Sequence, residues 1–400
     1  MNNSKPSSDA KASKYHFYLI CLSVFGVKGG TEVYSVFLLQ ALQDLYEKAS
    51  YDVFLKCEKP NPKNIRNLQF LPQTKFYYFG EPYYETNRWK RRWEYIAGGA
   101  KIVKSLIGQK PTVAIATALN TYCVVLDRLK RLTGMPYAIV VHGLEAWDTK
   151  NSSHKKALQN ANKVIAVSNY TRDRILKEGY LEPEKVFVLP NTFDASQFEI
   201  KPKPDYLLKK YGLSPEEPVI LTVTRLGKGF SEYKGYDKII KALPKIRQSI
   251  PNVRYLLGGK GDDVSRIEAL VKSLELEDCV TLAGFIPEEE LADHYNLCDV
   301  FAMPSKGEGF GIVYLEAMAS GKPVLGGNKD GTVDPLVNGE LGCLVEPDDV
   351  EAIAENLTSI LQGTYANEIM YQPEQLREKT IDLFGYDRFC QTVAELIENL

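Results

Sequence analysis

The sequence contains little that could cross-link the chain or bind a structural metal. Its seven cysteines are scattered without a Cys-x-x-Cys pair, and its four histidines show no spacing typical of metal ligands. An odd number of dispersed cysteines is typical of reduced thiols in a cytosolic protein. This pattern excludes a disulfide framework and a zinc site, and it predicts a cytoplasmic protein.

The sequence also lacks an excess of charge and any long apolar stretch. Its formal net charge is −2, whereas a dedicated nucleic-acid binder usually carries a strong basic excess. No stretch approaches the ~20 apolar residues of a membrane span. The first apolar run, residues 17–27, ends in a glycine turn rather than a small-residue cleavage site, which is typical of a buried strand and not of a signal peptide. We therefore expect a soluble or peripheral protein without a nucleic-acid partner.

What the sequence does contain is typical of a globular protein with two domains. The chain has 400 residues, of which 44% are hydrophobic and 25% charged, and one hydrophobic core rarely serves so many. Short apolar runs alternate with amphipathic segments, as in parallel sheets covered by helices on both faces. Residues 1–14 are polar and predicted to be disordered. Strands are predicted at 17–24, 51–56, 112–117, 137–142, 163–167, 186–189, 219–224, 254–258, 280–283, 300–303, 323–326 and 342–345. Helices are predicted between them, for example at 32–47, 169–178, 238–248 and 264–274.

The alternation of strands and helices pauses between Pro190 and Pro218. Several prolines and lysines in this segment predict a linker or hinge. Two doubly wound halves joined there would face each other across a cleft. Because ligands of such sheets bind at the carboxyl ends of the strands, the cleft is the expected site.

The strongest local feature is a predicted strand at 300–304, followed by a loop with three glycines and a helix at 312–320. Glycines let the backbone approach a ligand closely, and the start of a helix offers N–H groups and a positive dipole end, which suit a phosphate. Glu308 in the loop and Glu316 in the helix can face the same cavity, where carboxylates accept hydrogen bonds from the hydroxyls of a ribose or hexose. Taken alone, the segment is also compatible with a simple strand-to-helix turn that carries a surface glutamate.

The run from Glu308 through Glu316 resembles the Glu-seven-any-Glu motif of retaining glycosyltransferases of family four, which have the GT-B fold. The similarity spans nearly the whole chain and depends on the order and spacing of short motifs. These motifs lie at 29–32, 142–143, 164–168, 189–191, 225–226, 234–235, 283–285 and 308–324. The resemblance implies an α/β GT-B fold with two doubly wound, Rossmann-like domains facing across a cleft.

The resemblance also implies how the chain divides. In the GT-B architecture the last helix crosses back onto the N-terminal domain, and apolar residues recur at helical spacing from Tyr386 to Leu400. We therefore expect an acceptor-side N-terminal domain at 15–195 plus 384–400. A C-terminal domain at 196–383 would bind the nucleotide-sugar donor.

Within the C-terminal domain, the resemblance implies a role for each motif residue. Glu308 would contact the donor sugar and Glu316 the nucleotide ribose. The backbone after the strand at 280–283 would contact the base, and a glycine turn at 258–262 would line the diphosphate. The remaining donor-binding residues are then Gly261, Phe285, Ile286, Gly309, Phe310, Gly311 and Ile312.

Cationic side chains are expected beside the diphosphate. Arg225 ends a predicted strand and Lys234 follows shortly after it. Negative charge builds up on the diphosphate as it leaves, so fixed cations stabilise the transition state more than the ground state. No Asp-x-Asp motif follows a predicted strand, so we expect neither a metal nor another cofactor. The loop between Arg225 and Lys234 is longer than in the family pattern. Lys228, which lies in this loop, is therefore an alternative to Lys234 as the cation beside the diphosphate.

The opposite wall of the cleft is expected to come from the N-terminal domain. Gly29 and Gly30 lie in a glycine turn that opens a helix, and the Gly-x-Gly-x-x-Gly spacing of a dinucleotide-binding fingerprint is missing there. The resemblance places this turn beside the diphosphate and acceptor. His142 ends a predicted strand, and the resemblance implies that it contacts the donor sugar near the reacting carbon; a purely structural histidine is the alternative.

A basic segment with interleaved aromatic residues lies in the first half of the chain. Such a segment suits an interface with anionic lipid, where tryptophan sits at headgroup depth. The alternative is a solvated basic helix whose tryptophans pack into the core. The residues concerned are Arg88, Trp89, Lys90, Arg91, Arg92 and Trp93.

Together these features predict an enzyme of polysaccharide biosynthesis. It would move a hexosyl unit, with retention, from a UDP- or GDP-sugar to a hydroxyl of a glycan or lipid-linked glycan. It would act in the cytoplasm or at the cytoplasmic face of the membrane. Two alternatives remain open at this point: a nucleotide-sugar epimerase of the same fold, and a non-catalytic protein that binds sugar nucleotides.

Overall fold

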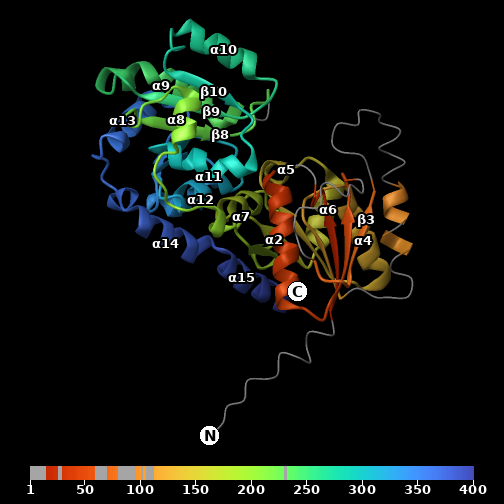
Figure 1. Cartoon of the computed structure of the whole chain (residues 1–400). Helices are drawn as coiled ribbons and strands as arrows, with labels where there is room; N and C mark the ends of the chain where they lie inside the picture. The colour runs from red at the N-terminus through yellow and green to blue at the C-terminus, as the bar shows by residue number, and fades with distance from the viewer. Residues whose placement is uncertain are drawn as a thin grey trace. The chain divides into compact units, whose positions relative to one another are not determined.

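The computed structural model describes residues 15–25, 29–58, 70–79, 96–100, 102–104, 112–228 and 232–400. Each of its two compact units is built on one parallel β-sheet (Figure 1). Unit 1 comprises Met1–Asn191 and Phe389–Leu400, and unit 2 comprises Thr192–Arg388. These divisions lie within five residues of the boundaries expected from the sequence.

Unit 1 contains a seven-stranded sheet in the order β3-β2-β1-β4-β5-β6-β7, in which neighbouring strands are parallel. Most of its strands are short apolar runs that are buried on both faces, as a parallel sheet requires. The strands are β1 (His16–Cys21), β2 (Ser50–Leu55), β3 (Thr74–Tyr78), β4 (Val113–Ala116), β5 (Tyr137–Val141), β6 (Lys163–Ala166) and β7 (Val186–Val188).

Helices cover both faces of this sheet. On one face, Tyr18 and Ile20 of β1 pack in a core with side chains of α4 (Thr121–Thr133) and α6 (Ser152–Asn160). On the other, Phe17 of β1 lies 5.4 Å from the ring of Tyr46 at the end of α2 (Gly30–Leu45). Two further helices are α5 (Leu144–Trp147) and α7 (Asn169–Leu176).

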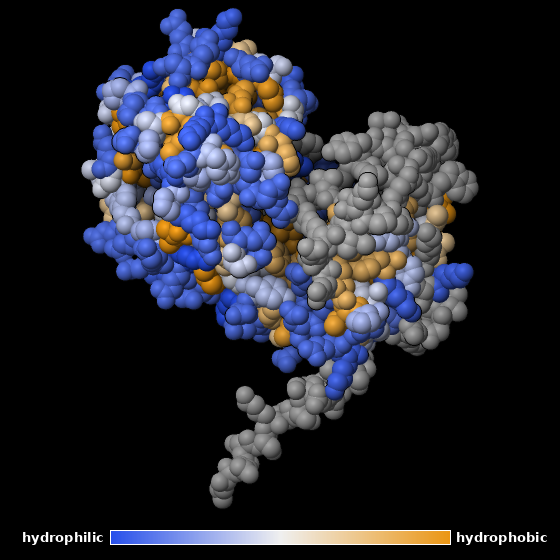
Figure 2. Space-filling view, viewed as in Figure 1, coloured by the Kyte–Doolittle hydropathy of each residue, from blue (hydrophilic) through white to orange (hydrophobic). Residues whose placement is uncertain are grey.

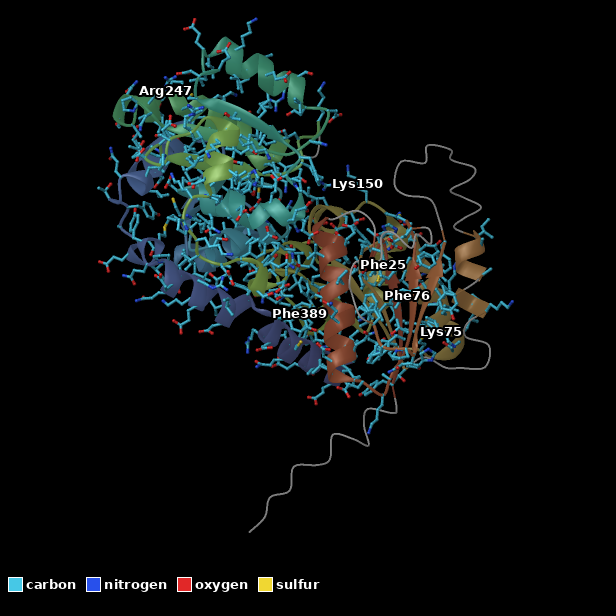
Figure 3. All side chains as sticks on the ribbon, viewed as in Figure 1. Phe25, Lys75, Phe76, Lys150, Arg247 and Phe389 are labelled. Atoms are coloured by element: carbon cyan, nitrogen blue, oxygen red, sulfur yellow. The ribbon has the colours of Figure 1, made fainter. Side chains whose placement is uncertain are left out.

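The last helix, α15 (Tyr386–Glu398), brings the C-terminal residues into unit 1. Its buried side chains include Phe389, whose ring lies 5.8 Å from that of Tyr34 in α2 (Figure 3). The same figure shows Phe25, just after β1, beside Phe76 of β3, with 5.1 Å between the ring centres. Aromatic contacts therefore hold both the segment after β1 and the last helix in unit 1.

Unit 2 contains a six-stranded sheet in the order β10-β9-β8-β11-β12-β13, again with parallel neighbours. The strands are β8 (Val219–Val223), β9 (Arg254–Gly258), β10 (Val280–Gly284), β11 (Val300–Met303), β12 (Val324–Gly327) and β13 (Cys343–Val345).

Alternating side chains of these strands build two layers of core. Val300 and Ala302 of β11 pack with α9 (Tyr236–Ser249), α10 (Val264–Ser273) and α13 (Val350–Leu361). Figure 1 shows α9 and α13 side by side over this face. Phe301 points to the opposite face, where its ring lies 5.7 Å from Tyr295 of α11 (Glu288–Leu297) and 5.6 Å from Tyr314 of α12 (Ile312–Ala319).

Two predictions of elements were wrong. The edge strand β3 was missed because its sequence, Thr-Lys-Phe-Tyr-Tyr, is partly exposed and forms no continuous apolar run. The predicted linker also contains a helix, α8 (Asp205–Tyr211), which packs on α11 through a hydrogen bond of 2.8 Å from the Tyr206 hydroxyl to Asp293. The prolines that suggested a linker instead bracket this helix. α14 (Pro373–Phe384) lies against α12 and completes the unit.

The described surface is mainly hydrophilic on the face shown in Figure 2, with small groups of apolar residues between polar ones. Individual apolar side chains do reach the solvent, and Leu132 and Phe285 are the most exposed of the large ones. Isolated apolar side chains at a surface are ordinary. Phe285 differs because it lies in a loop at the carboxyl end of a strand.

Candidate functional site

The two central loops of unit 2 lie where the order of its strands reverses. Strands are added from β8 outward to β9 and β10 on one side, and from β11 outward to β12 and β13 on the other. Ligands of open parallel sheets bind at the carboxyl ends of the strands at such a switch point. The loops after β8 and β11, residues 224–228 and 304–311, contain Arg225 and Glu308.

Backbone hydrogen bonds join the loops at this end of the sheet. The Leu226 amide donates to the Lys260 carbonyl at 2.9 Å, which links the loops after β8 and β9. A side chain on Gly261 would put its Cβ 1.7 Å from the Leu226 carbonyl oxygen, so the loops can approach this closely only with glycine there. In the structure Gly261 thus packs two loops together.

Lys234 and Glu308 form an ion pair. Lys234 ends a short 3₁₀ helix, η4 (Glu232–Lys234), and is followed by Gly235 with φ +76°. A Cβ at Gly235 would lie 2.2 Å from the Pro304 carbonyl oxygen. Glycine therefore lets the lysine-bearing turn press against the loop that carries Glu308.

A buried carboxylate, Asp330, lies on the other side of that loop. Its oxygen Oδ2 accepts a hydrogen bond of 2.6 Å from the Glu308 amide. Together with Arg225, these residues form what we call the charge cluster: Arg225, Lys234, Glu308 and Asp330. The structure thus brings three predicted site residues together and adds one that the sequence did not indicate.

The charges of the cluster influence one another. Burial lowers the pKa of Lys234 from its usual 10.5 to about 7, because loss of water outweighs the attraction of Asp330, and Arg225 repels the ammonium. Burial also raises the pKa of Asp330, against the effect of its hydrogen bonds and of Lys234. Titratable groups with strongly shifted pKa values are typical of functional sites.

Glu316 lies on the first turns of α12, and its orientation is set by a buried tyrosine. The Tyr295 hydroxyl, on α11, donates a hydrogen bond of 2.7 Å to Glu316 Oε2. Burial and the adjacent carboxylate raise the pKa of Tyr295 well above 10, so this hydroxyl stays a donor. A carboxylate can accept several hydrogen bonds, and Glu316 is half-buried.

The segment before α12 presents backbone rather than side chains. Phe310 is 1% exposed, and its ring packs 5.6 Å from that of Phe384. Gly311 is the N-cap of α12, and Ile312 is its first residue. Because the first N–H groups of a helix have no partner within the helix, this segment can hold an anion.

The loop after β10 carries the exposed aromatic side chain noted above. Phe285 is 62% exposed, and the Lys260 ammonium lies 5.1 Å from the centre of its ring. Ile286 packs back against Gly258, where an added Cβ would lie 2.4 Å from Ile286 Cδ1. Lys260 was not predicted, because a lysine in a glycine turn has no distinct signature.

Lys228, the competitor of Lys234, belongs to a different environment. Its backbone amide donates a hydrogen bond of 2.7 Å to Asp262, and its charge acts on Asp263. Arg225, by contrast, acts on Lys234 itself. These electrostatic effects associate Arg225 with Lys234, and Lys228 with Asp263.

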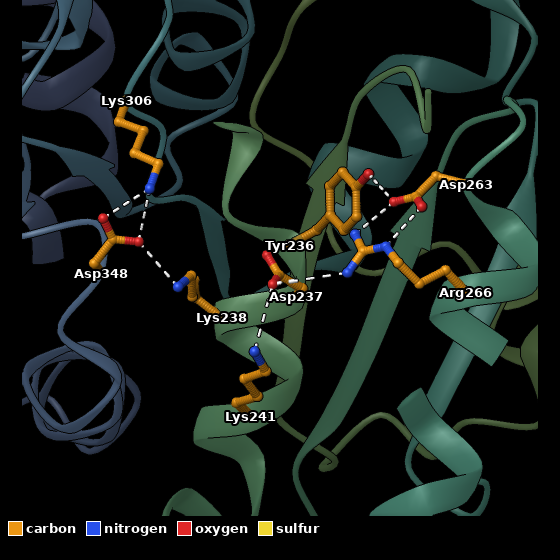
Figure 4. A network of polar contacts seen from close by, with 8 residues as sticks. All are labelled: Tyr236, Asp237, Lys238, Lys241, Asp263, Arg266, Lys306 and Asp348. Carbon is orange, nitrogen blue, oxygen red and sulfur yellow. Dashed lines mark hydrogen bonds and ion pairs between the residues drawn. The ribbon is translucent and has the colours of Figure 1, made fainter. Parts of the chain in front are cut away.

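A second polar network lies elsewhere in unit 2 (Figure 4). Asp263 accepts hydrogen bonds from the Tyr236 hydroxyl and from Arg266, which ties the start of α9 to the turn after β9. Asp348 pairs with Lys306 and with Lys238, which ties the loop after β11 to α9. Both sets of contacts lie outside the charge cluster.

In unit 1, His142 lies at the carboxyl end of β5. Its Nε2 lies 2.7 Å from the Thr117 carbonyl oxygen, and since a carbonyl only accepts, Nε2 carries the hydrogen. The ring also makes an edge contact with Tyr34, 5.3 Å between centres. The Glu145 carboxylate accepts a hydrogen bond from the His142 amide, which links the start of α5 to the end of β5.

Gly29 is the N-cap of α2, and Gly30 is its first residue. Residues 26–28, the rest of the glycine turn, lie outside the described residues. Just before them, the buried Glu58 carboxylate accepts hydrogen bonds from the amides of Val24 and Phe25, at 3.0 and 3.1 Å. The sequence predicts that this strand ends at Val24, but β1 ends at Cys21. The amides of Val24 and Phe25 bond to Glu58 and not to a neighbouring strand, which explains the difference.

Two further predictions concern the chain's environment. The basic aromatic segment, residues 88–93, lies outside the described residues. In the described part of the chain, no helix is both long and apolar enough to cross a membrane. The described residues also contain no group of three or more His, Cys, Asp or Glu side chains that could hold a metal ion.

Comparison with known families assigns both halves of the chain. Residues 206–379 match the family described as Glycosyl transferases group 1. Residues 28–197 match Glycosyltransferase Family 4.

Several characterised proteins are similar in sequence. A GDP-mannose-dependent alpha-(1-6)-phosphatidylinositol monomannoside mannosyltransferase of Mycolicibacterium smegmatis is 30% identical over 277 residues, which are 66% of this chain and 70% of that protein. The protein of the same name from Mycobacterium tuberculosis is 31% identical, and the match spans about half of each chain, 50% and 52%.

Solved structures are similar over nearly the whole chain. Sucrose-phosphate synthase of Thermosynechococcus elongatus superposes with a TM-score of 0.77 at 23% identity, covering 96% of this chain and 98% of that one. HepE of Anabaena in complex with UDP gives a TM-score of 0.75 at 20% identity, covering 96% and 100%. At these identities the likeness concerns the fold.

Proposed function

This chain belongs to the group 1 glycosyltransferases of glycosyltransferase family 4, and on that premise we propose that it transfers a hexosyl unit from a nucleotide-diphosphate sugar to a hydroxyl acceptor with retention. The predicted family, the α/β GT-B fold class with two Rossmann-like parallel sheets, and the predicted hexosyltransferase class are confirmed. The nucleotide, the sugar, the acceptor and the stereochemistry belong to the proposal.

The observation that supports it is the charge cluster at the switch point of unit 2. Lys234 forms an ion pair with Glu308, and the charge of Arg225 acts on Lys234. The loop that carries Glu308 leads directly into α12. A diphosphate bound at these carboxyl ends would meet both cations and the N–H groups of residues 310–312. Glu308 would contact the sugar attached to it, and Glu316 the ribose. Gly261, Phe285, Ile286 and Gly309 would complete the donor contacts.

For unit 1 we propose that His142 contacts the donor sugar near the reacting carbon. Its hydrogen bond to the Thr117 carbonyl fixes the orientation of the ring. The backbone of Gly29 and Gly30 is proposed to bind the diphosphate, as the start of a helix can.

The proposed reaction keeps its atoms in balance without a covalent enzyme intermediate. The bond from the anomeric carbon to the diphosphate oxygen breaks, and the acceptor oxygen bonds to the same face of that carbon. The acceptor's proton moves to the departing phosphate. Glu308 is not proposed as a nucleophile, because its carboxylate is held in an ion pair by Lys234.

The rate of transfer should depend on the protonation of Lys234. Its pKa in the folded protein is lowered to about 7, so the ammonium is present below that pH and is lost as the pH rises through it. We expect kcat/KM for the donor, which reports the free enzyme, to decline from about pH 7 upward. A Lys234→Met variant should have a lower kcat/KM than the parent, and this value should not decline over the same pH range. A parent profile that stays flat to about pH 9 would contradict the assignment.

The nucleotide and the acceptor are proposed from two kinds of observation. The loop after β10 would contact the base through backbone groups, and relatives include a protein named for GDP-mannose and one solved with UDP. We propose a UDP- or GDP-sugar as donor and a glycan or lipid-linked glycan as acceptor. Contact with a lipid-linked acceptor would use residues 88–93 at the cytoplasmic face of the membrane, and sedimentation with anionic vesicles tests that contact.

A thermal-shift panel with UDP, GDP and ADP tests the proposal, followed by transfer assays with the matching sugars. A ligand that binds the folded state at 100 times its Kd stabilises the protein by about 2.7 kcal/mol. We expect one nucleotide to raise Tm, and its sugar to be transferred in the presence of EDTA with the α or β configuration of the donor retained, as judged by NMR. Absence of any nucleotide effect, or an inverted product, would refute the corresponding part.

A further inference from the structure

Asp330, in the loop after β12, is a fully buried carboxylate with three hydrogen-bond donors around it. Its side chain is 0% exposed. Oδ2 accepts from the Ser305 hydroxyl at 2.6 Å and from the Glu308 amide at 2.6 Å, and Oδ1 accepts from the Thr332 amide at 3.0 Å. A buried charge with this many donors is held in one position, because moving it would leave polar groups unpaired.

The same loop also holds the other side of Glu308. The Gly331 amide donates a hydrogen bond of 2.8 Å to the Glu308 carbonyl. The amide and the carbonyl of Glu308 are therefore both fixed by adjacent residues of one loop. The backbone from which the Glu308 carboxylate extends thus has little freedom to shift.

Asp330 also acts on the cation that pairs with Glu308. It attracts the Lys234 ammonium, which burial and the neighbouring Arg225 both disfavour. Glu308 faces the same ammonium in the ion pair, and the ring of Tyr233 lies 5.4 Å from it. Removing the charge of Asp330 leaves Lys234 with one fewer carboxylate to support its protonated form.

We propose that Asp330 is a positioning residue for transfer: it fixes the backbone of Glu308 toward the donor sugar and stabilises the charge of Lys234 beside the diphosphate. This inference rests on the proposed function, because it assigns Asp330 a part in that reaction. Asp330 itself does not touch the substrate, since it is fully buried behind the loop.

The simpler role for Asp330 is that of a helix cap. It is the N-cap of the 3₁₀ helix η5 (Gly331–Val333) through its bond to the Thr332 amide. Asparagine caps as well as aspartate does, so an Asp330→Asn variant retains this role. If its oxygen caps Thr332, however, its NH₂ group faces the Glu308 amide, and two donors oppose each other. The variant therefore separates capping from positioning.

We expect Asp330→Asn to lower kcat by about 10²-fold, the effect of misplacing a reacting group by ~1 Å. The decline of kcat/KM with pH should also begin at a lower pH than in the parent, because Lys234 has lost an attracting charge. A role in capping alone predicts neither change. The measurements are steady-state kinetics from pH 5.5 to 9 and thermal unfolding of each variant.

Asp348→Asn is the matched control. Asp348 also pairs with a lysine of the loop after β11, Lys306, but it is half-exposed and does not bind the Glu308 backbone. It should keep kcat and the pH profile of the parent within about threefold, the range of a surface ion pair. The proposal is overturned if Asp330→Asn keeps parental kcat/KM and pH profile, or if its activity falls only in proportion to its folded fraction.

If Asp330→Asn does not fold, Ser305→Ala removes one of the two donors to Oδ2 and carries the test. It should lower kcat about 3- to 10-fold, the effect of one lost hydrogen bond, and parental kinetics would overturn the proposal. If the parent transfers no sugar at all, the proposed function has failed instead. In that case calorimetry still measures the affinity of Asp330→Asn and of Asp348→Asn for UDP or GDP. Equal affinities would contradict a role of Asp330 in supporting the charge of Lys234.

Discussion

Replacing Lys234 by alanine is expected to lower kcat/KM for the donor by about 10²- to 10³-fold. This is the range observed when one fixed donor to a developing negative charge is removed from an enzyme site. The side chain of Lys234 is only 16% exposed, so water replaces its charge poorly. The larger part of the loss should appear in kcat, because the charge on the diphosphate grows as the sugar departs.

Lys306→Ala is the control for this experiment. Lys306 lies on the loop that carries Glu308, but it is exposed and paired with Asp348 at the surface. Its removal should leave kcat/KM within about threefold of the parent. Because Lys234→Ala also leaves Glu308 and Asp330 without their cation, its thermal unfolding must be measured in parallel. A folded Lys234→Ala variant with parental kcat/KM would show that the charge cluster does not serve the diphosphate.

Replacing Glu316 by alanine is expected to raise KM for the donor by about 10- to 100-fold. A hydrogen bond to a charged group contributes roughly 1.5–3 kcal/mol, and tenfold in affinity corresponds to about 1.4 kcal/mol. The effect should fall on KM rather than on kcat, because the ribose is remote from the bond that breaks and is bound equally in ground and transition state. Isothermal titration with the nucleoside diphosphate should show the same loss.

Tyr295→Phe refines the interpretation of that result. It deletes the hydroxyl that orients Glu316 but leaves the carboxylate in place. We expect a rise in KM of about fivefold, close to the 1 kcal/mol of one lost hydrogen bond. A nucleoside monophosphate that lacks both ribose hydroxyls should bind to the parent and to Glu316→Ala with equal affinity. If it does, Glu316 contacts another part of the donor.

Most strands of unit 2 could be predicted because they are continuous apolar runs between glycines and prolines. β3 could not, since an edge strand is covered on fewer sides and does not need such a run. α8 was mistaken for part of a linker, because prolines occur both in linkers and beside the first turn of a helix. An edge strand and a helix flanked by prolines are recognised by their position in the fold, and the local sequence does not contain this information.

The candidate site was predictable to the extent that its residues are close together along the chain. Glu308 and Glu316 belong to one strand-loop-helix segment, so a local pattern reveals both. Asp330 acts on Glu308 from 22 residues further along and on Ser305 from 25 residues. Nothing local to Asp330 indicates that it is buried or which amide it faces. Tyr295, 21 residues before Glu316, was missed for the same reason.

The position of α15 has a consequence for the order in which the protein is made. Phe389 packs on Tyr34 in α2, and the charge of Glu398 is felt by Tyr46, so unit 1 is completed by residues that leave the ribosome after all of unit 2. Domains generally fold as units in the order of their synthesis. Unit 2 spans Thr192–Arg388, so at synthesis rates of about 5–20 residues per second its translation takes about 10 to 40 seconds. For that time the side of α2 that contacts α15 remains without this helix, unlike in an N-terminal domain made of one continuous segment.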